Sequence, residues 1–176
     1  MNRQRRHHMY FFLPPPAEIR REIAQFCSPA LVGTPVREDR LHVTIGTAGG
    51  YDETPRGVIA LIVEALADLT LPSCGLVFDT VIGGPRSALL KPSERLRGFD
   101  ALQIRIATAI GLHPALWSHF RPHITLGYDG RSMPARPIDP ISWTADRLCL
   151  VESLHGETRH IVHGSWPLTA CTQKAA

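Results

Sequence analysis

The chain has 176 residues, of which 44% are hydrophobic and 20% are charged, with a formal charge of +3 and a sequence pI of about 8.9. This composition is typical of one globular domain or two small, closely packed lobes, and no stretch approaches the roughly 18 uninterrupted apolar residues of a membrane span. The modest basicity is compatible with a phosphate-bearing partner but does not by itself indicate a nucleic-acid binder. The N-terminal region has no signal-peptide core and the four cysteines form no CxxC pair, so we expect a cytoplasmic protein with reduced thiols.

The N-terminal segment predicts a tail, a strand and a helix. Residues 1–8 contain three arginines, Arg3, Arg5 and Arg6. We expect residues 1–8 to form a flexible basic tail, in preference to a specific RNA contact. Met9–Leu13 is apolar and predicts a strand that ends at prolines 14–16, because proline donates no hydrogen bond to a sheet. Ala17–Phe26 carries apolar residues at helical spacing and predicts a helix.

Strands and helices follow one another through the centre of the chain. Leu41–Thr47 alternates apolar with polar residues and predicts a strand with one buried face, which we expect Gly49-Gly50 to end in a turn. Val58–Leu69 predicts a helix because its apolar residues fall along one side. The same criteria predict strands over Leu76–Ile82 and Ala88–Lys91 joined by a turn at residues 83–85, a helix over Leu96–Ile110 and a strand over His123–Tyr128.

The C-terminal part of the chain is expected to be all strand. A Pro-rich connection over Met133–Pro140 precedes three predicted strands, Ile141–Trp143, Arg147–Ser153 and His160–Trp166. Helices mixed with hairpin-like strand pairs favour an α+β fold with antiparallel sheets over a doubly wound parallel sheet.

Two short stretches share a pattern that carries chemistry. In "RLHVTI", His42 and Thr44 alternate with apolar residues, and "FRPHITLG" repeats this order with His123 and Thr125, 81 positions later. No other histidine in the sequence has threonine two positions later. Two such tetrads are expected by chance in about one random sequence in a hundred. Because the strand–helix–strand order also recurs, the duplication indicates two related lobes that face each other.

Each tetrad places two functional groups on one face of a strand, because residues i and i+2 point the same way. An imidazole titrates near neutral pH, so one histidine can accept a proton while the other donates one. Threonine hydroxyls can hold the non-bridging oxygens of a phosphate. These groups suit in-line attack of water or a hydroxyl on a phosphodiester, without a metal or a covalent intermediate.

Two plainer interpretations compete with a catalytic site. A single histidine beside a threonine on a strand is more often a partly exposed face residue. Two histidines could also bind zinc, but the sequence shows no third ligand at a defined spacing. The duplication of the whole tetrad favours a joint site over both alternatives.

The two tetrads resemble the HxTx signature of the 2H phosphoesterase superfamily, in particular its bacterial 2′-5′ RNA ligase and RNA 2′,3′-cyclic phosphodiesterase branch. The resemblance covers most of the chain and includes "MYFFLPPPAEIRREIAQF", "VREDRLHVTI", "FRPHITLG", "ISWTADRLCLVESL" and "GSWPL". It implies one domain made of two interleaved lobes, with two antiparallel sheets flanked by helices around a central groove.

The resemblance also implies an activity. His42 and His123 would be the catalytic acid and base, and Thr44 and Thr125 would bind the phosphate. Members of the family open a 2′,3′-cyclic phosphate at an RNA end to leave a 2′-phosphate, so we expect this reaction on RNA or nucleotides by a monomer without metal or cofactor. The alternatives are 2′-5′ ligation of tRNA halves, hydrolysis of another small cyclic phosphate, and RNA binding with a degenerate site. We assign His42 as acid to the leaving 3′-oxygen and His123 as base for water, although the sequence does not determine this order.

The sequence departs from the family pattern after each tetrad. Residues 46–50 replace a Phe-Leu-Gly-like stretch, and we interpret them as a turn in preference to an opening for a ligand. Tyr128 stands near a position that is often basic in the family, where it could stack on a base or simply pack. Another cation could make the contact to phosphate or RNA that this basic residue makes in the family. The candidates are Arg121, Lys91 and Arg131, and the alternative for each is an ordinary solvent-exposed charge.

Overall fold

The computed structural model describes residues 6–84, 86–157 and 159–170. In chain order the strands are β1 His7–Leu13, β2 Thr34–Pro35, β3 Val43–Tyr51, β4 Leu71–Pro72, β5 Cys74–Gly83, β6 Ser87–Lys91, β7 Ile124–Tyr128, β8 Met133–Ala145, β9 Arg147–Leu154 and β10 Arg159–Thr169. The helices are α1 Ala17–Ala24, α2 Pro29–Val32, α3 Arg56–Ala67 and α4 Arg97–Ala109, with 3-10 turns η1 Glu38–Arg40 and η2 Pro114–Trp117.

The strands form one strongly bent sheet. Its order is β4-β10-β9-β1-β3-β7-β6-β5-β8, with β2 added beside β7, and all pairs are antiparallel except β10 with β4. We call β10-β9-β1-β3 the first half and β7-β6-β5-β8 the second half. The halves meet at β3 and β7, where Val43 pairs with Ile124. The predicted α+β antiparallel fold is confirmed, and the two expected sheets are the halves of this one sheet.

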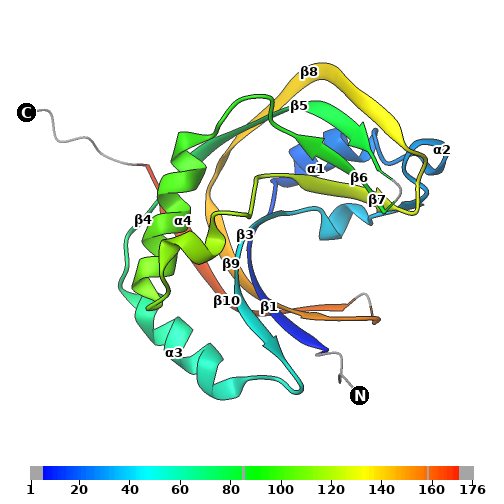
Figure 1. Cartoon of the computed structure of the whole chain (residues 1–176). Helices are drawn as coiled ribbons and strands as arrows, with labels where there is room; N and C mark the ends of the chain where they lie inside the picture. Colours follow the sequence, from blue (N-terminus) through cyan, green and yellow to red (C-terminus); the bar gives the residue numbers. More distant parts are fainter. Residues whose placement is uncertain (1–5, 85, 158, 171–176) are drawn as a thin grey trace, which may run out of the picture.

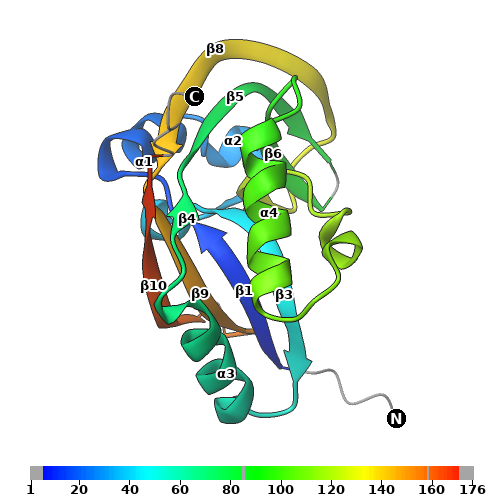
Figure 2. The same cartoon turned by 90° about the vertical axis from the view of Figure 1, so that its left-hand side faces the viewer.

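The sheet bends around an open concave side, and the helices lie outside it (Figure 1). Helix α4 packs against β3 of the first half and β5 of the second, and α3 packs against α4 and β10 (Figure 2). Helices α1 and α2 lie against β8 and against β6 and β7, respectively. No helix within the described residues is long and apolar enough to cross a membrane.

The hydrophobic core lies between the helices and the outer face of the sheet. Fully buried apolar side chains come from every central element and include Phe11, Leu13, Val43, Ile45, Phe99, Leu102, Ile106, Ile124 and Leu126. Each large side chain removed from water in this way contributes about 1.5–3 kcal/mol. The core therefore fixes the junction of the two halves. Polar side chains on the opposite, concave face can contact solvent or a ligand.

Strand β8 corrects the Pro-rich connection predicted over Met133–Pro140. Residues 133–145 form one strand paired with β5, and the predicted strand Ile141–Trp143 is its last part. Because β8 is the final strand in the sheet order, every second backbone N–H points away from the sheet. An edge strand therefore tolerates the three prolines that argue against a central strand.

The expected turn at Gly49-Gly50 is wrong. Both glycines continue β3, where they pair with Met9 and His8 of β1. Gly49 has φ 112°, a conformation that side chains with a Cβ rarely adopt, and the register shifts next to it. The strand bends at this bulge and ends at Tyr51.

The prediction of a flexible basic tail over residues 1–8 is wrong for His7 and His8. His7 and His8 belong to β1, whereas Arg3 and Arg5 lie outside the described residues. The side chain of His7 donates from Nδ1 to the carboxylate of Glu152, which is fully buried in β9. This bond and the pairing of β1 with β3 and β9 hold the start of the strand in the sheet.

Candidate active site

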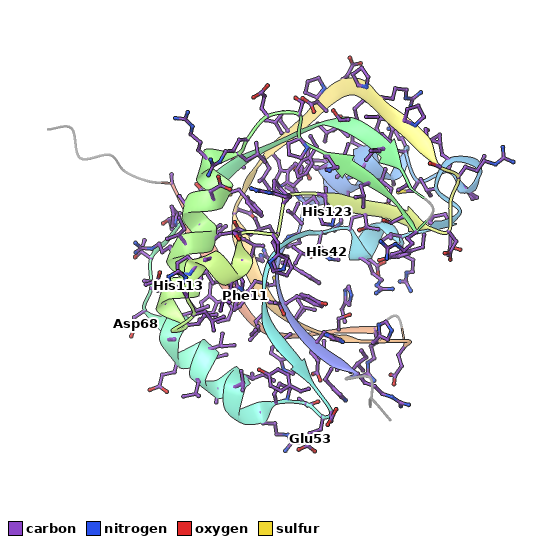
Figure 3. The ribbon with its side chains drawn as sticks, in the orientation of Figure 1. Phe11, His42, Glu53, Asp68, His113 and His123 are labelled. Carbon is purple, nitrogen blue, oxygen red and sulfur yellow. The ribbon has the colours of Figure 1, made fainter. Side chains whose placement is uncertain are left out.

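The two tetrads meet where the halves join. The antiparallel pair Val43–Ile124 puts His42 opposite Thr125 and Thr44 opposite His123. Val43 and Ile124 point into the core, so the four polar side chains share the concave face, where each is half-buried. An approximate twofold axis through this pair relates the tetrads, and the histidines occupy one diagonal of the array. Figure 3 shows the two histidines beside each other on the concave side.

Both imidazoles are oriented by the same hydrogen bond. Nδ1 of His42 donates to the carbonyl of Arg40 at 2.7 Å, and Nδ1 of His123 donates to the carbonyl of Arg121 at 2.8 Å. Because a carbonyl only accepts, Nδ1 carries the proton in each ring, and Nε2 of the neutral ring holds the free electron pair. Each histidine directly precedes the first residue of its strand. The tetrads thus share sequence, position and tautomer.

The surroundings of the two histidines differ. The ring of Phe12 stacks on His42 with centroids 3.6 Å apart, and the ring of His160 meets it edge-on at 5.6 Å. Burial lowers the pKa of His42 to about 4, opposed by the bond to the Arg40 carbonyl and reinforced by charges on His160, His123 and Arg40. The hydrogen bond of His123 to its carbonyl lies at the surface. The first half therefore encloses its histidine more than the second half does.

Arg40 and His160 belong to the site, although no pattern in the sequence singles them out. Nη2 of Arg40 donates to Nε2 of His160 at 3.1 Å. Burial lowers the pKa of His160, and the adjacent Arg40 guanidinium lowers it further, which favours the neutral, accepting ring. Together with Phe12, His42 and Val162 they line a cavity of about 140 Å³. Arg40 stands two residues before His42, but His160 lies on β10 and only tertiary structure brings it here.

The three cations proposed as substrate contacts lie in different places. Lys91 follows Leu90, which pairs with Ile124, so it stands beside His123, and strand alternation puts it on the concave face. Arg121 is exposed, and its carbonyl orients His123. Arg131 lines a separate cavity of about 320 Å³ near α2 and is not brought to the histidines. Lys91 is thus the candidate that the fold places best.

Tyr128 faces the concave side because of a bulge in β7. Ala88 pairs with Gly127 but Leu89 pairs with Thr125, so one residue of β7 is unmatched and the alternation reverses. Tyr128 is 50% exposed. Burial raises the pKa of Tyr10, and the charge of Tyr128 raises it further.

A family model described as the 2'-5' RNA ligase superfamily matches residues 10–157. The chain belongs to this superfamily of 2H phosphoesterases. The crystal structure of a phosphoesterase is 25% identical, covers 93% of this chain and 99% of its own, and has a TM-score of 0.73. No curated protein matches the sequence significantly.

Structures of E. coli LigT are similar to this 2H phosphoesterase over almost the whole chain. The complex of LigT with 3'-AMP is 26% identical, with 93% of this chain and 98% of LigT covered and a TM-score of 0.69. The complex with ATP is 25% identical, with 94% and 99% covered and a TM-score of 0.66. The bent sheet and its helices are therefore a shared fold and not a feature of this chain alone.

In this 2H phosphoesterase the first glycine after the first tetrad, Gly46, is buried. A Cβ atom on Gly46 would lie 2.2 Å from the ring of Trp117, whose Nε1 donates to the carbonyl of Thr47 at 2.9 Å. Only glycine fits at position 46, because the indole ring packs directly on the backbone there. The interpretation of residues 46–50 as a turn is wrong, and Trp117 fills the space that a ligand opening would need.

Among the residues that the structure describes, no group of three or more His, Cys, Asp or Glu side chains is arranged to hold a metal ion. One cysteine, Cys149, lines the cavity beside His42. Burial raises the pKa of this thiol, with smaller opposing effects of Ser165 and Arg147, so it stays protonated at neutral pH. The groups suited to move protons at this site are the two imidazoles.

Proposed function

We propose that this protein hydrolyses the 2′,3′-cyclic phosphate ends of RNA or nucleotides to 2′-phosphates, with His42 and His123 as acid and base. The observation that carries the proposal is the matched pair of Nδ1–carbonyl bonds, which gives both rings the same reactive Nε2 on one face. The complexes of E. coli LigT with 3'-AMP and ATP support a site for nucleotides. Thr44 and Thr125 flank the histidines and would donate to the phosphate oxygens.

The reaction requires two proton transfers. One imidazole takes a proton from water as its oxygen bonds to phosphorus, and the other gives a proton to the 3′-oxygen as the phosphorus–oxygen bond breaks. Negative charge grows on the non-bridging oxygens, where the threonine hydroxyls stabilise it. The products are a 2′-phosphate and a free 3′-hydroxyl, and proton exchange with water restores both rings.

The electrostatics favour one order of roles. Since the pKa of His42 is lowered to about 4, this ring is neutral at neutral pH and is ready to accept a proton. We therefore propose His42 as the base for water, and the complementary donation to the 3′-oxygen falls to His123. This order is the reverse of the one assigned from the sequence.

Alanine substitutions test the proposal. We expect His42→Ala and His123→Ala each to lower kcat on a 2′,3′-cyclic mononucleotide by roughly 10²–10⁴-fold in the presence of EDTA. His113→Ala, at an exposed histidine far from the pair (Figure 3), is the matched control and should retain activity. Full activity of either site variant would refute the assignment. Salt-sensitive RNA binding without any turnover would instead support the degenerate, RNA-binding alternative.

The superfamily to which the chain belongs is named for 2'-5' RNA ligation, so ligation is a second candidate activity. The same two imidazoles can direct attack of a 5′-hydroxyl on the cyclic phosphate in place of water, which forms a 2′-5′ linkage without ATP. Incubation with cleaved tRNA and analysis of the products as a 2′-phosphate or a 2′-5′-joined chain separates the two activities.

A further inference from the structure

A row of aromatic rings leads away from the candidate active site along β1. His8, Tyr10 and Phe12 alternate with core residues, so their rings share the concave face. The centroids of His8 and Tyr10 are 6.1 Å apart with planes at 17°, and those of Tyr10 and Phe12 are 5.9 Å apart at 10°. Phe12 stacks directly on His42. We call His8, Tyr10, Phe12 and His42 the ring row.

The outer part of the ring row remains accessible. Phe12 is 6% exposed beneath His42 and His160, whereas Tyr10 and His8 are half-buried. Val162 of β10, which is 60% exposed, belongs to the cavity beside His42 and extends the apolar surface near the row. The main core of the fold lies on the other face of the sheet, and on the concave face a small cluster of Phe12, Cys149 and Val151, with Tyr10 packed against it, forms the base of this surface.

The positively charged side chain of Arg40 lies beside the inner end of the ring row, at the candidate active site. The guanidinium of Arg40 bonds to His160, which is neutral when it accepts that bond, and Asp39, which lines the same cavity, forms its ion pair with Arg37. Nε of Arg40 is buried and has no hydrogen-bond partner among the described residues. A buried donor on a cation without a partner is costly, and an anionic oxygen would satisfy it.

The second half has no equivalent row. On the concave face Leu89 pairs with Thr125 as Phe12 pairs with Thr44, and Ser87 pairs with Tyr128. Phe78 of β5 is fully buried and stacks on Trp143 in the core. Flat surfaces on which a base can stack therefore extend from the histidines along the first half.

We propose that the first half contains an extended RNA subsite: the nucleotides upstream of the cyclic phosphate lie along β1, with their bases stacked on Tyr10 and His8 and the first internucleotide phosphate at Arg40. This inference rests on the proposed function and adds to it a binding path for the strand beyond its terminal nucleotide. Single-stranded RNA fits because ring faces accept any base and a cation next to them pairs with the backbone.

The first experiment compares substrate lengths. A 2′,3′-cyclic AMP and an adenosine tetranucleotide with the same cyclic end are assayed at one salt concentration. We expect kcat/KM to be at least about tenfold higher for the tetranucleotide, because each stacked base contributes to binding. Equal kcat/KM values would overturn the extended subsite while leaving the proposed hydrolysis intact.

Substitutions locate the effect on the ring row. Tyr10→Leu keeps an apolar side chain but removes the ring, and should reduce the tetranucleotide-to-mononucleotide ratio about tenfold, whereas Tyr10→Phe should keep most of it. His8→Leu should have a similar but smaller effect. Leu61→Ala, at a 67% exposed side chain of α3, is the control for loss of an exposed apolar group. If Tyr10→Leu and His8→Leu both leave the tetranucleotide-to-mononucleotide ratio unchanged, the upstream nucleotides do not bind along β1.

A binding measurement keeps the inference testable if no cyclic phosphate is turned over. The dissociation constant of a tetranucleotide ending in a 2′-phosphate is measured against that of 2′-AMP for the wild type and Tyr10→Leu, with thermal midpoints as the check on folding. Tighter tetranucleotide binding that Tyr10→Leu abolishes supports the subsite even then.

Arg40→Met tests the phosphate contact. The slope of the logarithm of the tetranucleotide association constant against the logarithm of the salt concentration should become shallower by about 0.7, because one cation–phosphate contact is lost. An unchanged slope would mean that Arg40 does not contact the RNA backbone.

Discussion

The two halves of the sheet carry the same tetrad in different settings. In the first half Phe12 covers His42, and the row continues to Tyr10 and His8. In the second half Leu89 takes the place of Phe12, and Lys91 stands beside His123. The halves thus agree in the two imidazoles and two hydroxyls of the tetrads and differ in the groups around them. If the proposed hydrolysis takes place here, this difference lets a pseudo-symmetric site hold an asymmetric substrate, with water on one side of the phosphorus and the leaving sugar on the other.

The largest expected effect tests what the halves share. If His42 and His123 act as one acid–base unit, the double substitution to alanine should cost little more than either single one, which is roughly 10²–10⁴-fold in kcat. The measurement is kcat on a 2′,3′-cyclic mononucleotide for the two single variants and the double variant. Losses that multiply would mean that the histidines act independently.

The threonines test whether the phosphate is held evenly. Thr44→Val and Thr125→Val each remove one hydroxyl donor and should lower kcat about 10²-fold, while Thr→Ser at the same positions restores the donor and most of the activity. Equal losses indicate a phosphate centred on the Val43–Ile124 axis. A loss confined to one threonine would place the phosphate in one half, and no loss in either would exclude both hydroxyls from the reaction.

A buried carboxylate tests the stability of the first half. Glu152 accepts hydrogen bonds from His7, from His163 at 2.6 Å and from Thr54 at 2.8 Å, and so ties β1, β9, β10 and the start of α3 together. Glu152→Gln should lower the free energy of unfolding by about 2 kcal/mol in urea denaturation, because the partners lose a charged acceptor. Glu157→Gln, at an exposed turn, is the control.

The pH dependence of that stability has a definite sign. Burial raises the pKa of Glu152, but the bonds from His7, His163 and Thr54 outweigh it and leave the pKa below the ordinary 4.5. The contribution is therefore complete above about pH 4.5 and is lost as the pH falls through the lowered pKa. A difference between wild type and Glu152→Gln that does not shrink in acid would contradict this account.

The smallest expected effect tests the difference between the histidines. Phe12→Leu gives the first half the residue that the second half has in that place, and should raise the pKa of His42 from about 4 toward its ordinary 6.5 because water reaches the ring. The measurement is an NMR titration of the imidazole proton, with Phe26→Leu, at a partly buried ring packed against the main core, as control. An unchanged midpoint would assign the enclosure of His42 to other groups.

The lowered pKa of His42 also predicts a change in stability. Because its folded pKa lies below the ordinary 6.5, the unfolded chain binds the proton more readily between these values. The free energy of unfolding should therefore decrease as the pH falls from about 6.5 to 4, and a His42→Gln variant should lack this part of the decrease.

Local patterns were enough to predict much of this protein. The alternation around His42 and His123 identified both site strands, the apolar spacing identified α1, α3 and α4, and the repeated tetrad identified the paired polar groups. These features follow from side-chain periodicity within a few residues, which the sequence contains in full. The prolines of β8 and the glycines of β3 misled the same reasoning, because an edge position and the pairing of β3 with β1, not local preference, decide what those residues do.

By itself, the sequence determined which groups this protein can bring to a phosphate: two imidazoles and two hydroxyls on strand faces. Only the tertiary structure decided how they meet. The Val43–Ile124 pair sets the diagonal of the histidines, β10 delivers His160 to Arg40, and β1 lays its ring row against His42. These contacts join residues far apart in the chain, and their geometry comes from the burial of a shared core, which no local pattern of residues encodes.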